Sequence, residues 1–190
     1  MNLPNKISLL RLILIPVFVA IFYVDFPYHY IVAAAVFAIA ACTDFIDGYI
    51  ARKYDLVTNL GKFLDSSADK VLVLSGLFLL VDAHMLPFIW GGVCAVVIIA
   101  REIMISCLRM VAAAKGYVLA ADKLGKWKTT FQDIAIVVLI VAFGLFGADY
   151  NNPLFIAGAV AFGISVVLTI VSGVHYLVAN RGVFKEEADK

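Results

Sequence analysis

The sequence predicts an all-α, polytopic membrane protein with six transmembrane helices around a polar cavity that opens to the cytoplasmic side. Hydrophobic residues make up 64% of the 190 positions, and the mean hydropathy is +1.00. A soluble domain of this length does not need so much apolar surface. Apolar runs long enough to cross a bilayer recur six times, and the basic residues fall on one side of the resulting topology.

Turn-forming residues separate the six runs, which we expect at 7–24, 30–53, 61–81, 86–112, 124–147 and 153–179. The first contains Pro16, which lacks an N–H and can kink a helix. The second run ends, and the third begins, in an aspartate-rich stretch. Pro87 opens the fourth run, while the fifth follows a lysine-rich segment and Pro153 opens the sixth. Soluble segments and linkers are not evident, so one membrane domain over 1–190 is expected.

The basic residues indicate the orientation of these spans. Three of the predicted loops, 25–29, 82–87 and 148–152, contain no Lys or Arg, so all 15 basic residues belong to the other side. Cytoplasmic segments of membrane proteins carry the excess of Lys and Arg. Both termini are therefore expected in the cytoplasm.

Ionisable residues recur at one depth when residues are counted inward from the outer ends of the spans, at about 1.5 Å per residue. Five of the six spans place one there: Arg11, Asp44, Asp69, Arg101 and Asp133. Intramembrane charges at a common depth favour a shared polar cavity. The alternative is pairing between helices, for example of Arg101 with Asp133. The sixth span supplies no formal charge and is expected on the outside.

Four carboxylates lie within residues 44–69 of this apolar chain. Asp44 and Asp47 are three residues apart and Asp65 and Asp69 four apart, so each pair shares a helix face. An antiparallel hairpin centred near 56–57 sets Asp44 level with Asp69, and Asp47 level with Asp65. The four carboxylates can then converge.

Such a cluster of hard oxygen ligands suits divalent cations. Four carboxylates exceed the need of one Mg²⁺, so two bridged cations, Mg²⁺ or Mn²⁺, are the natural arrangement for phosphoryl chemistry. Gly48, Ala51 and Gly61 continue the same faces and allow close helix approach or leave room for a ligand. A solvated acidic loop or a structural ion network is the alternative.

These residues form a pattern that resembles the signature of the CDP-alcohol phosphatidyltransferases. All eight defined positions match: Asp44, Asp47, Gly48, Ala51, Arg52 and, after eight residues, Gly61, Asp65 and Asp69. The resemblance implies a six-helix fold, usually a homodimer, in the bacterial cytoplasmic (inner) membrane, with the site at the cytoplasmic surface. It also implies metal-dependent transfer of a phosphatidyl group from CDP-diacylglycerol to an alcohol, with release of CMP.

The same resemblance implies roles for single residues. The four aspartates hold the metals, and Asp69 also acts as general base. The nucleotide contacts of the family map onto Gly48, Ala51, Arg52, Thr58 and Gly61. A P-N-x-x-[ST]-x-x-R segment, here Asn5, Ser8 and Arg11, opens the first helix in similar bacterial enzymes and is implied to line the cytidine and phosphate region. Helix capping and headgroup contact are the alternative for this segment, and a simple loop or cap role for Thr58.

A basic cluster points to the acceptor. Arg101 and Arg109 lie near one helix face, and Lys126 and Lys128 open the fifth span on the same side. Such donors suit an acceptor that carries a phosphate, although ordinary charges that contact anionic lipid are the alternative. The R-E-x5-L-R and L-G-K-x-K-T patterns resemble the phosphatidylglycerophosphate synthase subgroup, which implies sn-glycerol 3-phosphate as acceptor.

Two other functions remain open from the sequence. The family could use another acceptor, as in a cardiolipin synthase or a phosphatidylinositol-phosphate synthase. A cation transporter could also use membrane aspartates, but it predicts internal repeats and ligands near the midplane, whereas these carboxylates lie toward one face. No nucleic-acid partner is expected.

Overall fold

The structure is a computed structural model, and it confirms the all-α fold. It describes residues 3–54, 58–86, 90–116, 119 and 123–181; at 3–4, 44–52, 59–60, 62 and 123 it describes the backbone alone. Within these ranges every regular element is a helix. The six helices are α1 (Leu3–Tyr23), α2 (His29–Lys53), α3 (Asn59–Asp82), α4 (Gly91–Ala114), α5 (Lys123–Phe146) and α6 (Pro153–Ala179).

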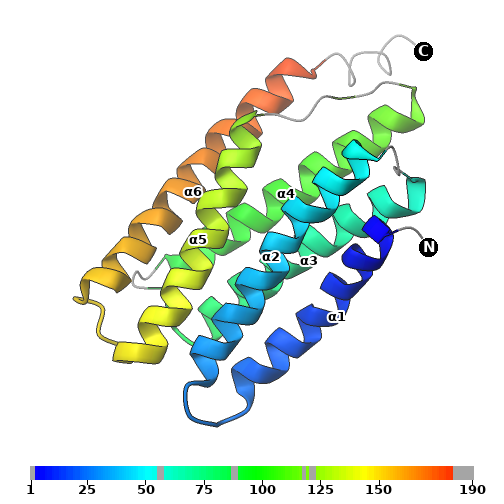
Figure 1. Cartoon of the computed structure of the whole chain (residues 1–190). Helices are drawn as coiled ribbons and strands as arrows, with labels where there is room; N and C mark the ends of the chain where they lie inside the picture. Colours follow the sequence, from blue (N-terminus) through cyan, green and yellow to red (C-terminus); the bar gives the residue numbers. More distant parts are fainter. Residues whose placement is uncertain (1–2, 55–57, 87–89, 117–118, 120–122, 182–190) are drawn as a thin grey trace.

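The helices run up and down as one elongated bundle (Figure 1). α1 packs on α2 and α3, α2 also packs on α5, and α5 makes its most extensive contact with α6. α4 joins the bundle through α3 and α6. We call the end at which α1, α3 and α5 begin, and α2, α4 and α6 end, the polar end.

Four helices contain segments long and apolar enough to cross a membrane: Asn5–Tyr23, Gly91–Ala114, Leu124–Phe146 and Pro153–Ala179. α2 is apolar over the shorter stretch His29–Thr43. α3 carries Asp65, Asp69 and Lys70 in its first half, which lowers its hydropathy. These helices are those of a polytopic membrane protein.

Two helix starts differ from the sequence prediction by four or five residues. α1 begins at Leu3, so Asn5 lies in its first turn. α4 begins at Gly91 and not at 86. A Cβ atom added at Gly91 would lie 2.6 Å from the Cβ of Leu86, so the Leu86 side chain packs against the first residue of the helix. Pro87, which the sequence predicts to open this span, lies outside the described residues.

The apolar core fills the half of the bundle away from the polar end. The rings of Phe18 and Phe37 meet edge to face with centroids 5.3 Å apart, joining α1 to α2. At Gly76 on α3, an added Cβ would lie 2.9 Å from the ring of Phe37 and 3.0 Å from Ile136 on α5. Because glycine has no side chain, three helices meet closely here and close the bundle.

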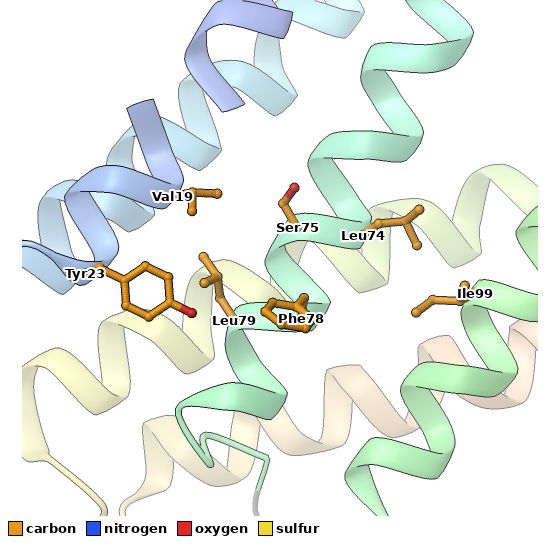
Figure 2. A pocket seen from close by; sticks show the side chains of 7 residues that line it. All are labelled: Val19, Tyr23, Leu74, Ser75, Phe78, Leu79 and Ile99. Carbon is orange, nitrogen blue, oxygen red and sulfur yellow. The ribbon is translucent and has the colours of Figure 1, made fainter. Parts of the chain in front are cut away.

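An apolar groove of about 360 Å³ lies between α1, α3 and α4 in the same half (Figure 2). It is lined by Val19, Tyr23, Leu74, Ser75, Phe78, Leu79 and Ile99. At its edge the Tyr23 hydroxyl donates to the Asp82 carboxylate at 2.8 Å. The lining carries no cluster of charged groups, so the candidate site lies elsewhere.

Candidate functional site

Arg11 links the first three helices at the polar end. Its side chain is fully buried. The Nη1 atom donates to Asp65 Oδ1 on α3 at 3.3 Å, and Nε donates to Thr43 Oγ1 on α2 at 3.3 Å. Thr43 in turn donates to the carbonyl of Ala40 at 2.6 Å. One guanidinium therefore fixes the relative positions of α1, α2 and α3 beside the predicted aspartate site.

Asp65 and Asp69 are one turn apart on α3, as the sequence predicts. The Asp65 side chain is 46% exposed although its Arg11 partner is buried. Thr43, which Arg11 contacts together with Asp65, immediately precedes Asp44 on α2. The α2 backbone just before Asp44 and the Asp65 side chain on α3 therefore lie on either side of one guanidinium.

The side chains of five predicted site residues lie outside the described part of the structure. These residues are Asp44, Asp47, Gly48, Ala51 and Arg52. The α2 backbone continues through all five positions and ends at Lys53.

The described aspartates fit a hard divalent cation. Carboxylate oxygens are ligands that Mg²⁺ and Mn²⁺ prefer. Asp65 is anchored on the protein side by Arg11 while nearly half of its side chain remains exposed. Ligating carboxylates in proteins are commonly held in this way by a hydrogen bond from behind.

A second contact joins the start of α1 to the start of α3. Thr58 caps α3: its Oγ1 accepts from the backbone N–H of Gly61 at 3.0 Å, and its hydroxyl donates to Asn5 Oδ1 at 3.2 Å. A Cβ at Gly61 would lie 2.4 Å from that Asn5 oxygen, so any larger residue here would displace the Asn5 side chain. Three of the residues predicted to contact the CDP-lipid therefore lie together. Ser8, a fourth, is buried one turn further along α1.

The predicted acceptor residues divide into two groups. Arg101 on α4 and Lys128 on α5 converge on one carboxylate, Glu102: Arg101 Nη1 donates at 2.9 Å, and the Lys128 ammonium makes a short contact with the same Oε1 atom. Arg101 Nη2 also donates to Ser172 on α6 at 2.9 Å. Lys128 is only 2% exposed. A buried ammonium of this kind requires a carboxylate partner.

The other two acceptor candidates lie apart from this carboxylate. Arg109, two turns beyond Arg101, donates through Nε to the Tyr176 hydroxyl at 3.1 Å, with its guanidinium 5.4 Å from the ring centroid. Arg101 and Arg109 therefore both reach α6, as their spacing predicts. Lys126 is exposed. α6 contains no Asp, Glu, Lys or Arg, and it supplies hydroxyl partners to both arginines.

Sequence reasoning assigned no role to Glu102 or Gln132. Glu102 was visible only as the neighbour of Arg101. Gln132 lies one turn after Lys128 on α5 and is fully buried, with neither amide atom hydrogen-bonded in the described structure. The i, i+4 spacing of Lys128 and Gln132 in an otherwise apolar helix was the available signal, because two buried polar residues on one face favour a polar interior.

The chain is similar to known proteins over nearly its whole length. A family model described as CDP-alcohol phosphatidyltransferase matches residues 1–171. A protein of Bacillus subtilis strain 168 is 41% identical, and the match covers 94% of this chain and 95% of that protein. A Haemophilus influenzae protein is 39% identical over 95% of this chain and 94% of its own length. A Rickettsia bellii protein is 35% identical over 96% of this chain and 97% of its own length. All three are named CDP-diacylglycerol–glycerol-3-phosphate 3-phosphatidyltransferase.

Proposed function

This chain belongs to the CDP-alcohol phosphatidyltransferase family, and we propose that it transfers the phosphatidyl group of CDP-diacylglycerol to sn-glycerol 3-phosphate. The products are phosphatidylglycerophosphate and CMP. The observation that carries this function is the near-complete coverage of relatives at 35–41% identity that are named for it.

Asp69 is the proposed general base. Its carboxylate takes the proton of the acceptor hydroxyl, whose oxygen then attacks the phosphorus on the lipid side of the diphosphate. The bond from that phosphorus to the bridging oxygen breaks, and CMP leaves with the bonding electrons. Because a carboxylate is a weak base, positioning of the two substrates must supply much of the rate.

Two divalent cations, Mg²⁺ or Mn²⁺, are proposed to be held by Asp44, Asp47, Asp65 and Asp69. When bound, such cations neutralise the diphosphate and the leaving CMP. The support from this chain is the pairing of Asp65 with Asp69 on one turn of α3, together with the approach of α2 at Thr43 to the same guanidinium as Asp65.

The CDP-lipid is proposed to bind beside the aspartates, between the start of α1, the end of α2 and the start of α3. Support comes from the contacts among Asn5, Thr58 and Gly61, which place polar atoms of α1 and α3 together at the polar end. The full set that the resemblance implies for this lipid is Asn5, Ser8, Arg11, Gly48, Ala51, Arg52, Thr58 and Gly61.

The acceptor phosphate is proposed to bind to Arg101 and Lys128, with Arg109 and Lys126 nearer the entrance. Arg101, Lys128 and Glu102 together carry two positive charges and one negative charge, a net charge of +1. The Arg101 Nε atom is buried and makes no hydrogen bond in the described structure. A phosphate oxygen is a suitable acceptor for such a donor.

The protein is a polytopic membrane protein, and its finer placement is part of the proposal. We place it in the bacterial cytoplasmic membrane as a single domain over 1–190, with the active site and both termini in the cytoplasm. An even number of antiparallel helices brings the start of α1 and the end of α6 to the same end of the bundle (Figure 1). We further propose a homodimer, which crosslinking in native membranes can test.

The decisive experiment measures CMP release by the purified protein with CDP-diacylglycerol and Mg²⁺ or Mn²⁺. Glycerol 3-phosphate should be the productive acceptor, and phosphatidylglycerol, inositol phosphate and serine should be poor ones. Asp69→Asn should abolish turnover while nucleotide binding is retained. Preference for inositol phosphate or phosphatidylglycerol would change the acceptor within the family, and absence of CMP with every acceptor would overturn the enzyme function.

A further inference from the structure

We propose that Arg11 is a positioning residue whose guanidinium holds the Asp65 carboxylate in the orientation that binds a divalent cation. The inference rests on the cation site in the proposed function. It assigns Arg11 a task other than direct contact with the CDP-lipid, the role that the resemblance implies for it.

Burial distinguishes these two roles. The Arg11 side chain is fully buried, whereas Asp65 is 46% exposed. The contact between Nη1 and Oδ1, at 3.3 Å, therefore lies on the inner side of the carboxylate. A substrate that enters from the polar end meets Asp65 before Arg11, so the guanidinium is placed to act through the aspartate.

The orientation of the guanidinium is itself fixed. Nε donates to Thr43 Oγ1 at 3.3 Å, and Thr43 is anchored to the Ala40 carbonyl one turn earlier in α2. Because the guanidinium is planar and rigid, fixing Nε also fixes the direction of Nη1. Asp65 is therefore oriented relative to α2, the helix that carries Asp44 and Asp47.

The positive charge of Arg11 and its positioning of Asp65 have opposite effects on the affinity for a cation. A positive charge beside a cation site repels the cation, so removal of Arg11 should tighten cation binding if the charge were all that mattered. Loss of an outer partner of a ligating carboxylate, in contrast, weakens metal binding by about 10–100-fold. The sign of the change therefore separates a positioning role from a charge effect.

Mn²⁺ titration of the full-length protein in detergent, without nucleotide or lipid substrate and followed by the EPR signal of free Mn²⁺, tests the inference. Arg11→Met should raise the Mn²⁺ dissociation constant about 10–100-fold. Arg11→Lys should recover only part of the loss, because an ammonium lacks the planar fork. Thr43→Val keeps every charge and should weaken binding less than Arg11→Met.

Lys70→Met is the matched control. Lys70 lies on α3, five residues after Asp65, and its ammonium donates to Ser66 at 2.8 Å. Its removal deletes a positive charge from the same helix without removing the Asp65 contact, so Mn²⁺ affinity should stay unchanged or rise slightly. A thermal unfolding curve without metal identifies any variant that has not folded; if Arg11→Met does not fold, Arg11→Lys and Thr43→Val decide the question.

The outcomes separate this inference from the proposed function. If the wild-type protein releases CMP but shows no saturable Mn²⁺ binding, both the proposed cation site and this inference are overturned. Saturable wild-type binding that Arg11→Met leaves equal or tighter would overturn the positioning role alone. If Arg11→Met lowers the affinity for CMP and leaves the affinity for Mn²⁺ unchanged, Arg11 contacts the CDP-lipid directly and the positioning role is overturned.

Discussion

At the scale of single residues, Glu102 determines what the basic cluster can do. Arg101 and Lys128 bring two positive charges into the interior between α4, α5 and α6, and Glu102 Oε1 contacts both. Removing one partner of a buried charge group leaves the others uncompensated, which costs more than the pair itself contributes. Glu102 therefore both permits Lys128 to be buried and fixes its position.

Replacing Glu102 should affect the acceptor more than the CDP-lipid. In Glu102→Gln, Lys128 loses its counter-charge and Arg101 loses an ionic partner, so both donors shift from their present positions. We expect a higher KM for glycerol 3-phosphate, a nearly constant KM for CDP-diacylglycerol and a lower thermal midpoint. Steady-state kinetics with each substrate varied in turn measure this difference. Equal rises in both KM values would show that Glu102 supports the bundle and not the acceptor site.

The spacing of residues along the chain predicted the depth of the charged groups but not their partners. Counting along the helices predicted that Arg11, Asp69 and Arg101 share one depth. Partner choice depends on how each helix is rotated about its axis, which spacing does not determine. Arg101 therefore contacts Glu102 and Ser172, whereas the sequence suggested Asp133 as one possible partner.

At the scale of elements, α3 joins the apolar core to the aspartate site. Gly76 lies seven residues after Asp69, two turns along the helix and near the same face. Its neighbours across the interface are Phe37 on α2 and Ile136 on α5. The close approach at Gly76 therefore sets how α3 leans toward α2, and with it the distance between the two pairs of aspartates.

Gly76→Val should consequently damage both stability and turnover. The Cβ atom alone would lie 2.9 Å from Phe37 and 3.0 Å from Ile136, and valine adds two further methyl groups. Overpacking of this kind costs about 1–3 kcal/mol. Thermal unfolding in detergent and the rate of CMP release are the two measurements.

Gly163→Val on α6 is the control for that substitution. A Cβ at Gly163 meets no atom within 4 Å in the described structure, so the same change in helix propensity comes without the clash. We expect its thermal midpoint and turnover to stay near wild type. A similar loss in both variants would mean that the helix backbone, and not the contact with α2 and α5, accounts for the effect.

At the scale of the whole molecule, the length of the apolar runs determined most of the fold. Five of the six predicted spans agree with the helices within four residues at either end, because a bilayer of fixed thickness sets the length of each crossing. The α4 start departs most, since Leu86 packs back onto Gly91. Tertiary packing of that kind leaves no periodic signal in the sequence.

The sidedness of the bundle can be tested by labelling cysteines in cells. The three native cysteines would first be replaced by serine, and Asn151→Cys and Arg181→Cys would then be made separately. Both positions are exposed and lie at opposite ends of α6. Because Lys and Arg are absent from 148–152, a membrane-impermeant maleimide should label position 151 from outside intact cells, once the outer membrane, where present, is made permeable. Position 181 should react only in inverted vesicles.

The two labelling patterns test separate parts of the topology. Reaction of both positions from the same side would mean that α6 does not cross the membrane, so the six-span arrangement would fail. Reaction at 181 from outside and at 151 from inside would mean that α6 crosses the membrane in the opposite direction. The aspartate site lies at the same end of the bundle as residue 181, because α1, α3 and α5 begin there. A reversed result would therefore place the site outside the cell, away from soluble glycerol 3-phosphate, and would contradict the proposed function as well as the orientation.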